Sequence, residues 1–224
     1  MNYPLASGET GYPGFPILSG MEMRDPAASI GEKAPADPTS SGIGFSARFW
    51  EQWIRYVVTQ DAKGNALTLD PQDPGQWQQR ISELTKMQDI NNPDLGTLAE
   101  RGGKMLVIQG TTDQIVSYRS TVDYFNRVQA AMGPEAVNDF SRLYLVPGLD
   151  HWTKYMAFNP LWDWAAALDN WVEQGQAPQN QVASDTTAEG NNRTRPLCEY
   201  PAWPKYNGTG DVNTASSFTC VIEP

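Results

Sequence analysis

The chain has 224 residues, 40% of them hydrophobic, and a net charge of −10 at neutral pH. This length can bury one core with an appendage, and the negative charge repels phosphate groups, so neither nucleic acid nor a membrane is expected as a partner. No apolar run approaches the roughly 20 residues of a membrane span, and the N-terminal residues show no signal-peptide pattern.

Residues 1–87 combine irregular and helical patterns. Residues 1–43 are rich in proline, glycine and serine, which predicts an irregular segment. Apolar residues then recur at helical spacing and predict an amphipathic helix over 45–58. A turn-rich stretch over 59–75 separates it from a second expected helix over 77–87.

Two short apolar runs form the centre of the chain, Met105–Ile108 and Leu143–Val146. Each has the length of a strand that is buried on both faces. A helix is expected between them over 117–132, ended by Gly133-Pro134. This strand–helix–strand order predicts α/β architecture with a parallel pair of strands.

A third helix is expected after the second run. Asn159-Pro160 offers a capping side chain followed by proline at the first helical position, and Gly175 marks the end. The predicted helix therefore covers 161–174. Its apolar stripe is expected to face inward and consists of Leu161, Trp164, Leu168, Trp171 and Val172. The tail from about residue 177 has few periodic apolar residues and is expected to be a long loop.

The only two cysteines, Cys198 and Cys220, lie in this tail. They lack CxxC spacing and neighbouring histidine, so a disulfide that closes the tail is favoured over two free thiols. A disulfide is typical of an oxidising compartment, which predicts a secreted or periplasmic protein. Three regions result: an irregular segment over 1–43, the α/β part over 44–176 and the disulfide-closed tail over 177–224.

Asp113 and His151, the only histidine, follow the two predicted strands. Reacting groups in open α/β sheets collect just past the carboxyl ends of the strands. The order of acid before histidine fits the last two members of a Ser–acid–His triad. In the alternative interpretation, Asp113 belongs to a polar turn and His151 caps a loop, with Asp150 as its local partner.

Five segments together resemble the tannase and feruloyl esterase family of α/β-hydrolases. They are GGKMLVIQGTTDQIV at 102–116, DFSRLYLVPGLDHW at 139–152, WDWAAALDNWVEQGQAPQ at 162–179, RPLCEYP at 195–201 and SFTC at 217–220. The resemblance covers about residues 94–224, with a weaker likeness over 11–58. It implies a partial α/β-hydrolase fold: the last parallel strands with flanking helices, a remnant of the lid and a long C-terminal loop.

The resemblance also implies a function and roles for single residues. Asp113 matches the triad acid, His151 the triad base, and Cys198 and Cys220 the C-terminal disulfide pair. The implied activity is that of a serine-type carboxylic ester hydrolase without a cofactor, acting on esters of aromatic acids. Trp152 and Tyr155 either stack on the aromatic ring of the substrate or pack as ordinary apolar side chains. The family's calcium loop has no match here, so no metal is expected.

Two departures from the family pattern concern the nucleophile. Trp152 stands where the family usually has a cysteine that is bonded to a cysteine beside the nucleophilic serine. No G-x-S-x-G occurs, and the nearest sequence, Ser40-Ser41-Gly42-Ile43-Gly44, has no strand before it. The chain is therefore expected to supply only Asp113 and His151, with the missing N-terminal half or a second copy of the chain as partner. The alternative is a non-catalytic fragment or pseudoenzyme that acts as an association module.

Overall fold

The computed structural model describes residues 45–113, 115–151, 156–190 and 192–222. The chain divides into two compact units, Met1–Asn91 and Asn92–Pro224. The irregular segment predicted over 1–43 lies outside the described residues, and the three-part division predicted from composition stays a prediction. No helix in the described ranges is long and apolar enough to cross a membrane.

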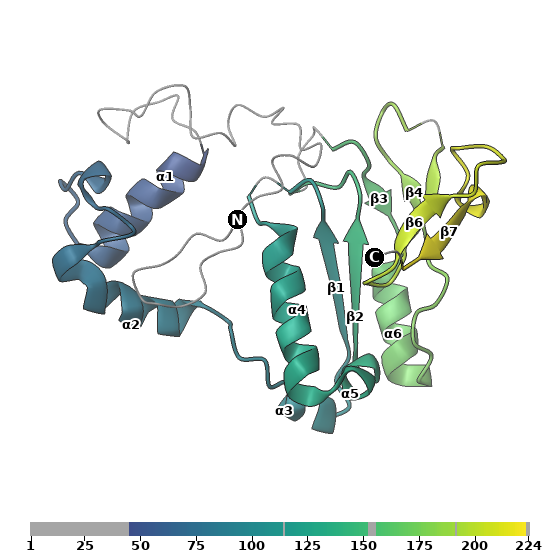
Figure 1. Ribbon diagram of the computed structural model, residues 1–224, viewed down its shortest axis with the longest axis horizontal. Coiled ribbons are helices and arrows are strands. Elements are labelled where there is room, and N and C mark those ends of the chain that lie inside the picture. Colours follow the sequence, from purple (N-terminus) through teal and green to yellow (C-terminus); the bar gives the residue numbers. More distant parts are fainter. Residues whose placement is uncertain (1–44, 114, 152–155, 191, 223–224) are drawn as a thin grey trace. The chain divides into compact units, whose positions relative to one another are not determined.

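The first unit is built from helices and short helical turns (Figure 1). Its elements are α1 (Phe45–Gln52), the π-helix η1 (Trp53–Val58), the 3₁₀ turns η2 (Ala66–Thr68) and η3 (Gly75–Trp77), and α2 (Gln78–Gln88). Both predicted helices are therefore present. Their small apolar core comprises Ile54, Val58, Ala66 and Leu84.

The π-helical end of the first predicted helix was not foreseen. The N–H and the hydroxyl of Thr59 both donate to the carbonyl of Ile54, at 2.8 and 3.0 Å. A bond to the fifth residue back widens the helix from the α to the π form. The apolar spacing over 45–58 is the same in both cases, so the sequence pattern did not distinguish them.

The second unit carries the parallel strands and the tail. Its elements are α3 (Gly96–Glu100), β1 (Met105–Gly110), α4 (Tyr118–Met132), α5 (Pro134–Asn138), β2 (Ser141–Val146), β3 (Pro160–Leu161), α6 (Trp164–Gln174), β4 (Val182–Asp185), β5 (Thr194–Pro196), β6 (Trp203–Tyr206), the 3₁₀ turn η4 (Ala215–Ser217) and β7 (Phe218–Val221).

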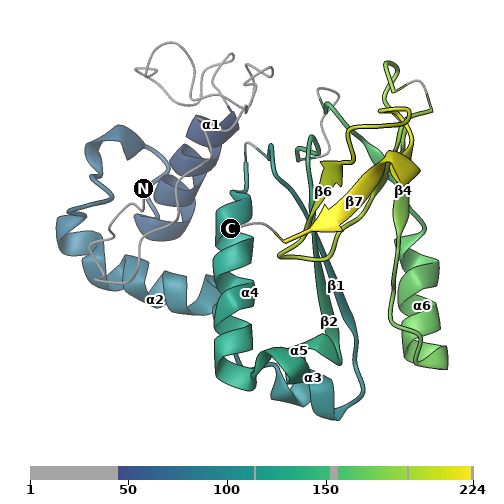
Figure 2. The ribbon, with the colours of Figure 1, turned by 45° about the vertical axis from the view of Figure 1, so that its right-hand side comes forward.

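The strands β1 and β2 pair in parallel, in register from Met105 with Ser141 to Gly110 with Val146. Figures 1 and 2 show α4 and α6 on opposite sides of this pair. On the α4 side, Phe125 and Val128 pack with Leu143 in one apolar cluster. The predicted α/β class is confirmed, and both strands end at the same edge of the sheet.

The helix expected over 161–174 starts three residues later than predicted. Asp163 is its N-cap, accepting from the N–H of Ala166 at 3.0 Å, while Pro160 belongs to β3 and pairs with Asp185 of β4. The predicted inward stripe is also wrong in part. Trp171 is buried, but the side chains of Leu161, Trp164 and Val172 are mainly exposed.

The tail is more ordered than the long loop that the sequence predicts. β4 and β5 of the tail form an antiparallel sheet with β3, which precedes α6, and β6 pairs with β7. These strands have only two to four residues each, too few for an alternating apolar pattern to stand out. The disulfide between Cys198 and Cys220 is present, with a Cα–Cα distance of 5.5 Å.

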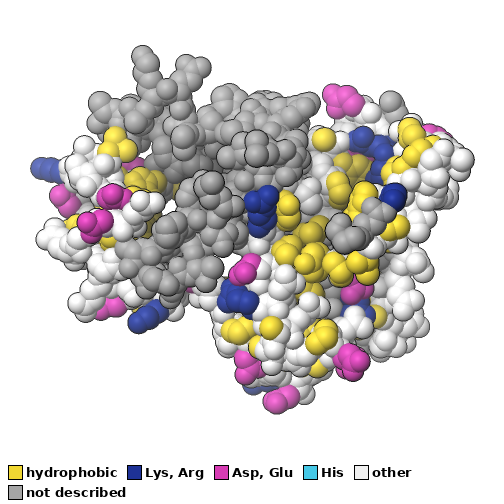
Figure 3. All heavy atoms as spheres, viewed as in Figure 1, with side chains coloured by type: hydrophobic (Ala, Val, Ile, Leu, Met, Phe, Trp, Pro, Cys, Tyr) yellow, Lys and Arg dark blue, Asp and Glu magenta, His cyan; other side chains and the backbone are white. Residues whose placement is uncertain are grey.

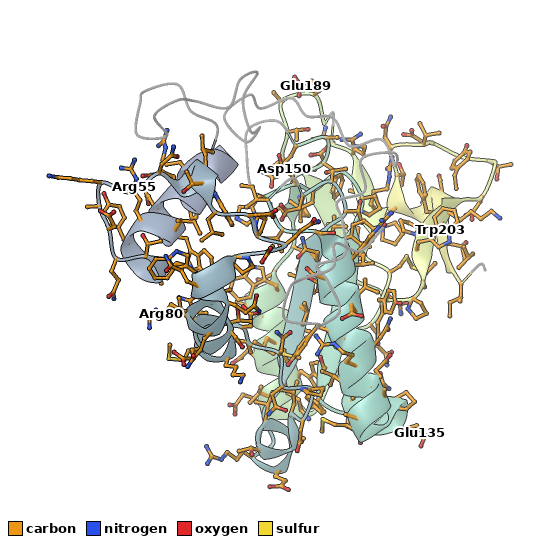
Figure 4. All side chains as sticks on the ribbon, turned by 60° about the vertical axis from the view of Figure 1, so that its left-hand side comes forward. Arg55, Arg80, Glu135, Asp150, Glu189 and Trp203 are labelled. Carbon is orange, nitrogen blue, oxygen red and sulfur yellow. A yellow bond between two sulfur atoms is a disulfide. The ribbon has the colours of Figure 1, made fainter. Side chains whose placement is uncertain are left out.

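The tail also reaches back to the parallel sheet. Tyr144 of β2 forms a bridge with Glu199, and the N–H of Tyr200 donates to the carbonyl of Leu143 at 2.8 Å. A pocket of about 400 Å³ lies between the tail and the segment that follows β2, with Phe158, Arg195 and Trp203 in its lining. Figure 4 labels Trp203 of this lining. Figure 3 shows hydrophobic side chains gathered on one face of the second unit.

Candidate active site

The ends of β1 and β2 bring two loops together. The N–H of Thr111 donates to the carbonyl of Val146 at 3.1 Å, which extends the ladder one residue past β1. The N–H and hydroxyl of Thr112 both donate to the carbonyl of Leu149, at 3.2 and 2.8 Å. The residue after Thr112 and the residues after Leu149 therefore lie side by side, at the carboxyl edge where α/β enzymes place reacting groups.

Asp113 is buried, with 4% of its surface exposed. Its Oδ1 accepts from the backbone N–H groups of Ile115 and Val116, both at 2.8 Å. Its Oδ2 accepts from the side-chain amide of Gln109 at 3.2 Å. The turn that follows β1 thus forms around the carboxylate and fixes its position.

His151 places Nδ1 at 2.9 Å from Oδ2 of Asp113. A carboxylate only accepts hydrogen bonds, so Nδ1 carries the proton of the neutral ring and the lone pair is left on Nε2. The histidine side chain is 45% exposed, whereas that of Asp113 is 5% exposed. The pair therefore has a buried carboxylate and a partly exposed imidazole.

The loop that carries His151 is closed at its base. The carbonyl of Gly148 accepts from the N–H groups of Ala157 and Phe158, at 3.0 and 3.1 Å. Gly148 has a φ of 85°, a backbone conformation that favours glycine. Asp150, the neighbour of His151, is buried and lies near the carboxyl ends of the strands (Figure 4).

The two interpretations of Asp113 turn out to be compatible. Its Oδ1 organises the polar turn, as the structural alternative proposed, and its Oδ2 bonds the histidine, as the triad order proposed. The predicted substrate-binding residues Trp152 and Tyr155 lie outside the described residues, as do Ser40 and Ser41. Their predicted roles stay predictions.

Sequence reasoning did not identify Gln109 as part of this site. Besides its bond to Asp113, Gln109 accepts a hydrogen bond from the hydroxyl of Thr121 at 3.1 Å. The available signal was a single polar residue at the end of an apolar strand. In the described part of the chain, no group of three or more His, Cys, Asp or Glu side chains could hold a metal ion. The expectation of a site without metal stays a prediction.

The chain belongs to the tannase and feruloyl esterase family, whose model matches residues 1–221. It is 41% identical to an uncharacterized esterase of Agrobacterium fabrum, over 97% of this chain and 39% of that protein. A probable feruloyl esterase of Arthroderma benhamiae is 36% identical over 75% of this chain, which covers 32% of that relative. The chain therefore spans less than two fifths of the length of these curated relatives.

The crystal structure of feruloyl esterase B from Aspergillus oryzae shares the fold. It superposes with a TM-score of 0.78 at 22% identity, over 98% of this chain and 43% of that chain. The family resemblance and the α/β-hydrolase fold expected from the sequence are both confirmed.

Proposed function

We propose that this chain supplies the acid and the base of a carboxylic ester hydrolase that works by a Ser-His-Asp mechanism. The observation that carries the proposal is the 2.9 Å contact between Oδ2 of Asp113 and Nδ1 of His151 at the carboxyl edge of the parallel strands. The membership of this chain in the tannase and feruloyl esterase family also supports the proposal.

In the acylation step, Nε2 of His151 takes the proton of the serine hydroxyl as the oxygen attacks the ester carbonyl carbon. Asp113 stabilises the imidazolium that results and keeps the ring in one orientation. The tetrahedral intermediate then collapses and breaks the bond to the alcohol oxygen. His151 returns its proton to that oxygen, so the alcohol leaves neutral and the acyl group stays on serine.

Deacylation repeats these steps with water as the nucleophile. His151 takes a proton from water as the water oxygen attacks the acyl carbon. The second tetrahedral intermediate then collapses and breaks the bond between the acyl carbon and the serine oxygen, to which His151 returns the proton. The products are one alcohol and one carboxylic acid. The His151 side chain is 45% exposed, which is compatible with a base that contacts both the serine and water.

The proposed substrates are esters of aromatic acids. The support is the family's description and the relative named as a probable feruloyl esterase. We propose that Trp152 and Tyr155, close to His151 in the sequence, stack on the aromatic ring of the acid.

The serine is proposed to come from polypeptide outside this sequence. No G-x-S-x-G occurs in the 224 residues, and the chain spans only 39% of the Agrobacterium fabrum relative. The partner would be either the remainder of the enzyme or a second chain. In either case it must bring a serine hydroxyl within hydrogen-bond distance of Nε2 of His151.

The free edge of β1 is the proposed contact for that partner. The N–H groups of Met105 and Thr111 point to β2, donating to Phe140 and Val146. Backbone groups alternate along a strand, so those of Leu106 and Ile108 point the other way. Among the described residues no strand pairs with that edge, and a further parallel strand would satisfy it.

The disulfide between Cys198 and Cys220 supports an oxidising compartment as the working location. We therefore propose that the protein is secreted or periplasmic. Expression in a reducing cytoplasm should give a protein with two titratable thiols, and export should give one with none.

The proposed mechanism is tested by adding the partner. The chain is co-expressed with the part of the Agrobacterium fabrum relative that is not matched here, and hydrolysis of aryl esters is measured with and without His151→Ala. Turnover that requires both parts and is abolished by His151→Ala supports the proposal. Equal hydrolysis by the His151→Ala pair would reject it.

A non-catalytic association module is the second candidate function, favoured by the free edge of β1 and the missing nucleophile. Labelling with a fluorophosphonate distinguishes the two, because only an activated serine reacts. The module would be favoured by two results together: no labelling of the co-expressed pair, and sedimentation of this chain as an oligomer at micromolar concentration. A labelled serine in the partner would favour the esterase.

A further inference from the structure

We propose that Gln109 is a positioning residue for the acid–base pair, oriented by Thr121 so that it fixes the Asp113 carboxylate toward His151. The inference rests on the proposed function, in which that pair activates a serine. It adds to Asp113 and His151 two residues of the same chain, from β1 and α4, that touch neither the substrate nor the reacting atoms.

The Asp113 carboxylate is fully occupied by donors. Oδ2 accepts from Nε2 of Gln109 at 3.2 Å and faces Nδ1 of His151 at 2.9 Å. Oδ1 accepts from the N–H groups of Ile115 and Val116. A carboxylate offers about four lone-pair positions, so Gln109 fills the one that the backbone and the histidine leave.

The orientation of the Gln109 amide follows from its surroundings. Its Nε2 lies 3.2 Å from the carbonyl of Gly110 and 3.4 Å from that of Val116, as well as near Oδ2 of Asp113. All three are acceptors without a proton, so a flipped amide would place oxygen against oxygen three times. The side chain therefore presents N–H groups to Asp113.

Thr121 holds the other end of the amide. Its hydroxyl donates to Oε1 of Gln109 at 3.1 Å, and Thr121 lies in the first turns of α4. Hydrogen bonds thus run from α4 through Gln109 of β1 to Asp113 and then to His151 in the loop after β2. This series ties the orientation of the imidazole to two regular elements, which a carboxylate on a turn alone would not do.

Replacement of Gln109 should remove a hydrogen bond from only one oxygen of Asp113, Oδ2. The two backbone bonds to Oδ1 stay and keep the turn in place, whereas Oδ2 loses the donor that directs it toward His151. The population of rings with the proton on Nδ1 should then fall in favour of the Nε2–H tautomer. That tautomer has no lone pair on the nitrogen that must receive the serine proton.

His151 is the only histidine of the chain, so its tautomer can be read directly. The full 224-residue chain is labelled with ¹⁵N-histidine, and the ring nitrogen shifts are recorded at about pH 9, where imidazoles are neutral. In Gln109→Met we expect the ratio of Nδ1–H to Nε2–H rings to fall about tenfold, the scale of one hydrogen bond to a charged group. Thr121→Val should lower the same ratio less, and Thr121→Ser should restore it.

The matched control is Gln181→Met. Gln181 is a half-buried glutamine of the same unit whose amide accepts from Trp162 Nε1 at 2.7 Å, so this change should leave the histidine shifts as they are. An unchanged ratio in Gln109→Met, or an equal fall in Gln181→Met, would overturn the inference. If Gln109→Met does not fold, the ratio of Nδ1–H to Nε2–H rings is compared between Thr121→Val and Thr121→Ser. Equal ratios in these two variants would overturn the inference.

The wild-type spectrum separates this inference from the proposed function. A wild-type ring in the Nε2–H form would contradict the Asp113–His151 pair itself, and with it the proposed mechanism. A wild-type ring in the Nδ1–H form that Gln109→Met leaves unchanged would overturn only the role of Gln109.

Discussion

The backbone of Gly110 lies so close to Leu149 that a Cβ on Gly110 would fall 2.1 Å from the Leu149 carbonyl oxygen. That oxygen also accepts both hydrogen bonds of Thr112. The end of β1 and the loop after β2 are therefore packed backbone against backbone. His151 follows Leu149 by two residues, so this contact sets where the histidine loop leaves the sheet.

Gly110→Ala should therefore displace the loop and destabilise the fold. Backbone on both sides leaves no flexible side chain to move aside, and we expect a loss of about 3 kcal/mol in the free energy of unfolding. Urea titration followed by circular dichroism measures it. The control is Gly96→Ala at the start of α3, where a Cβ would meet mainly the flexible Asp94 side chain at 3.0 Å. Equal stability of Gly110→Ala and wild type would contradict the packing argument.

Asp113→Asn should separate the structural role of Asp113 from its role toward the histidine. An Asn oxygen can still accept the N–H groups of Ile115 and Val116, so the turn should form. The amide nitrogen then faces Nδ1 of His151 and favours a ring protonated on Nε2, which cannot accept the serine proton. We expect native circular dichroism and, for the proposed esterase formed with the co-expressed partner, a fall in kcat of about 10⁴, the scale of this change in a serine protease triad. Less than a tenfold fall would argue against the mechanism.

The sequence predicted the meeting of Asp113 and His151 because each follows a short apolar run, and parallel strands end at one edge. It did not predict Gln109, since a polar residue at a strand end is common and its partner Thr121 lies on a helix. Contacts between side chains of different elements depend on packing, which periodicity does not describe. The close approach of Gly110 to Leu149 was missed for the same reason.

The start of α6 shows a second limit of sequence reasoning. Asn159-Pro160 has the residue types of a helix start, but the chain pairs Pro160 with Asp185 and uses Asp163 as the cap. Both Asp163 and Asn159 are acceptable caps by residue type, and the choice depends on a strand that lies more than 20 residues further along the chain. Local preference therefore located the helix but not its first turn.

The disulfide should stabilise the tail measurably. Cys198 and Cys220 are 22 residues apart, and closing a loop of that size contributes about 3 kcal/mol in the chain-entropy model. The double variant Cys198→Ser/Cys220→Ser should lose about that much free energy of unfolding relative to the oxidised wild type. Reduced wild type is the control, because it should unfold at the same urea concentration as the double variant. Identical midpoints with and without reductant would contradict the prediction.

The ion pair of buried Asp185 and partly buried Arg193 should make the free energy of unfolding depend on pH in acid. Burial by itself raises the pKa of Asp185, but hydrogen bonds from the N–H groups of Thr187 and Asn159 and from Arg193 outweigh it and lower the pKa below its ordinary value. Arg193 also donates to the carbonyl of Ala157, at the far end of the histidine loop. The pair therefore joins β4, the segment before β5 and the base of that loop.

A carboxyl group whose pKa is lower in the folded chain contributes stability above its unfolded pKa of about 3.9. That contribution is lost as the pH falls through the folded pKa. Asp185→Asn should lower the free energy of unfolding by about 3 kcal/mol at pH 7, since it removes a buried carboxylate from its ion pair. The difference in free energy of unfolding between wild type and variant should become smaller at a pH of about 3. Urea titrations of wild type and variant at both pH values measure these two differences in free energy of unfolding. The control is Asp169→Asn, at an exposed position of α6. It should change the free energy of unfolding by less than about 0.5 kcal/mol at pH 7. A difference between wild type and Asp185→Asn that stays constant or becomes larger in acid would contradict the lowered pKa of Asp185.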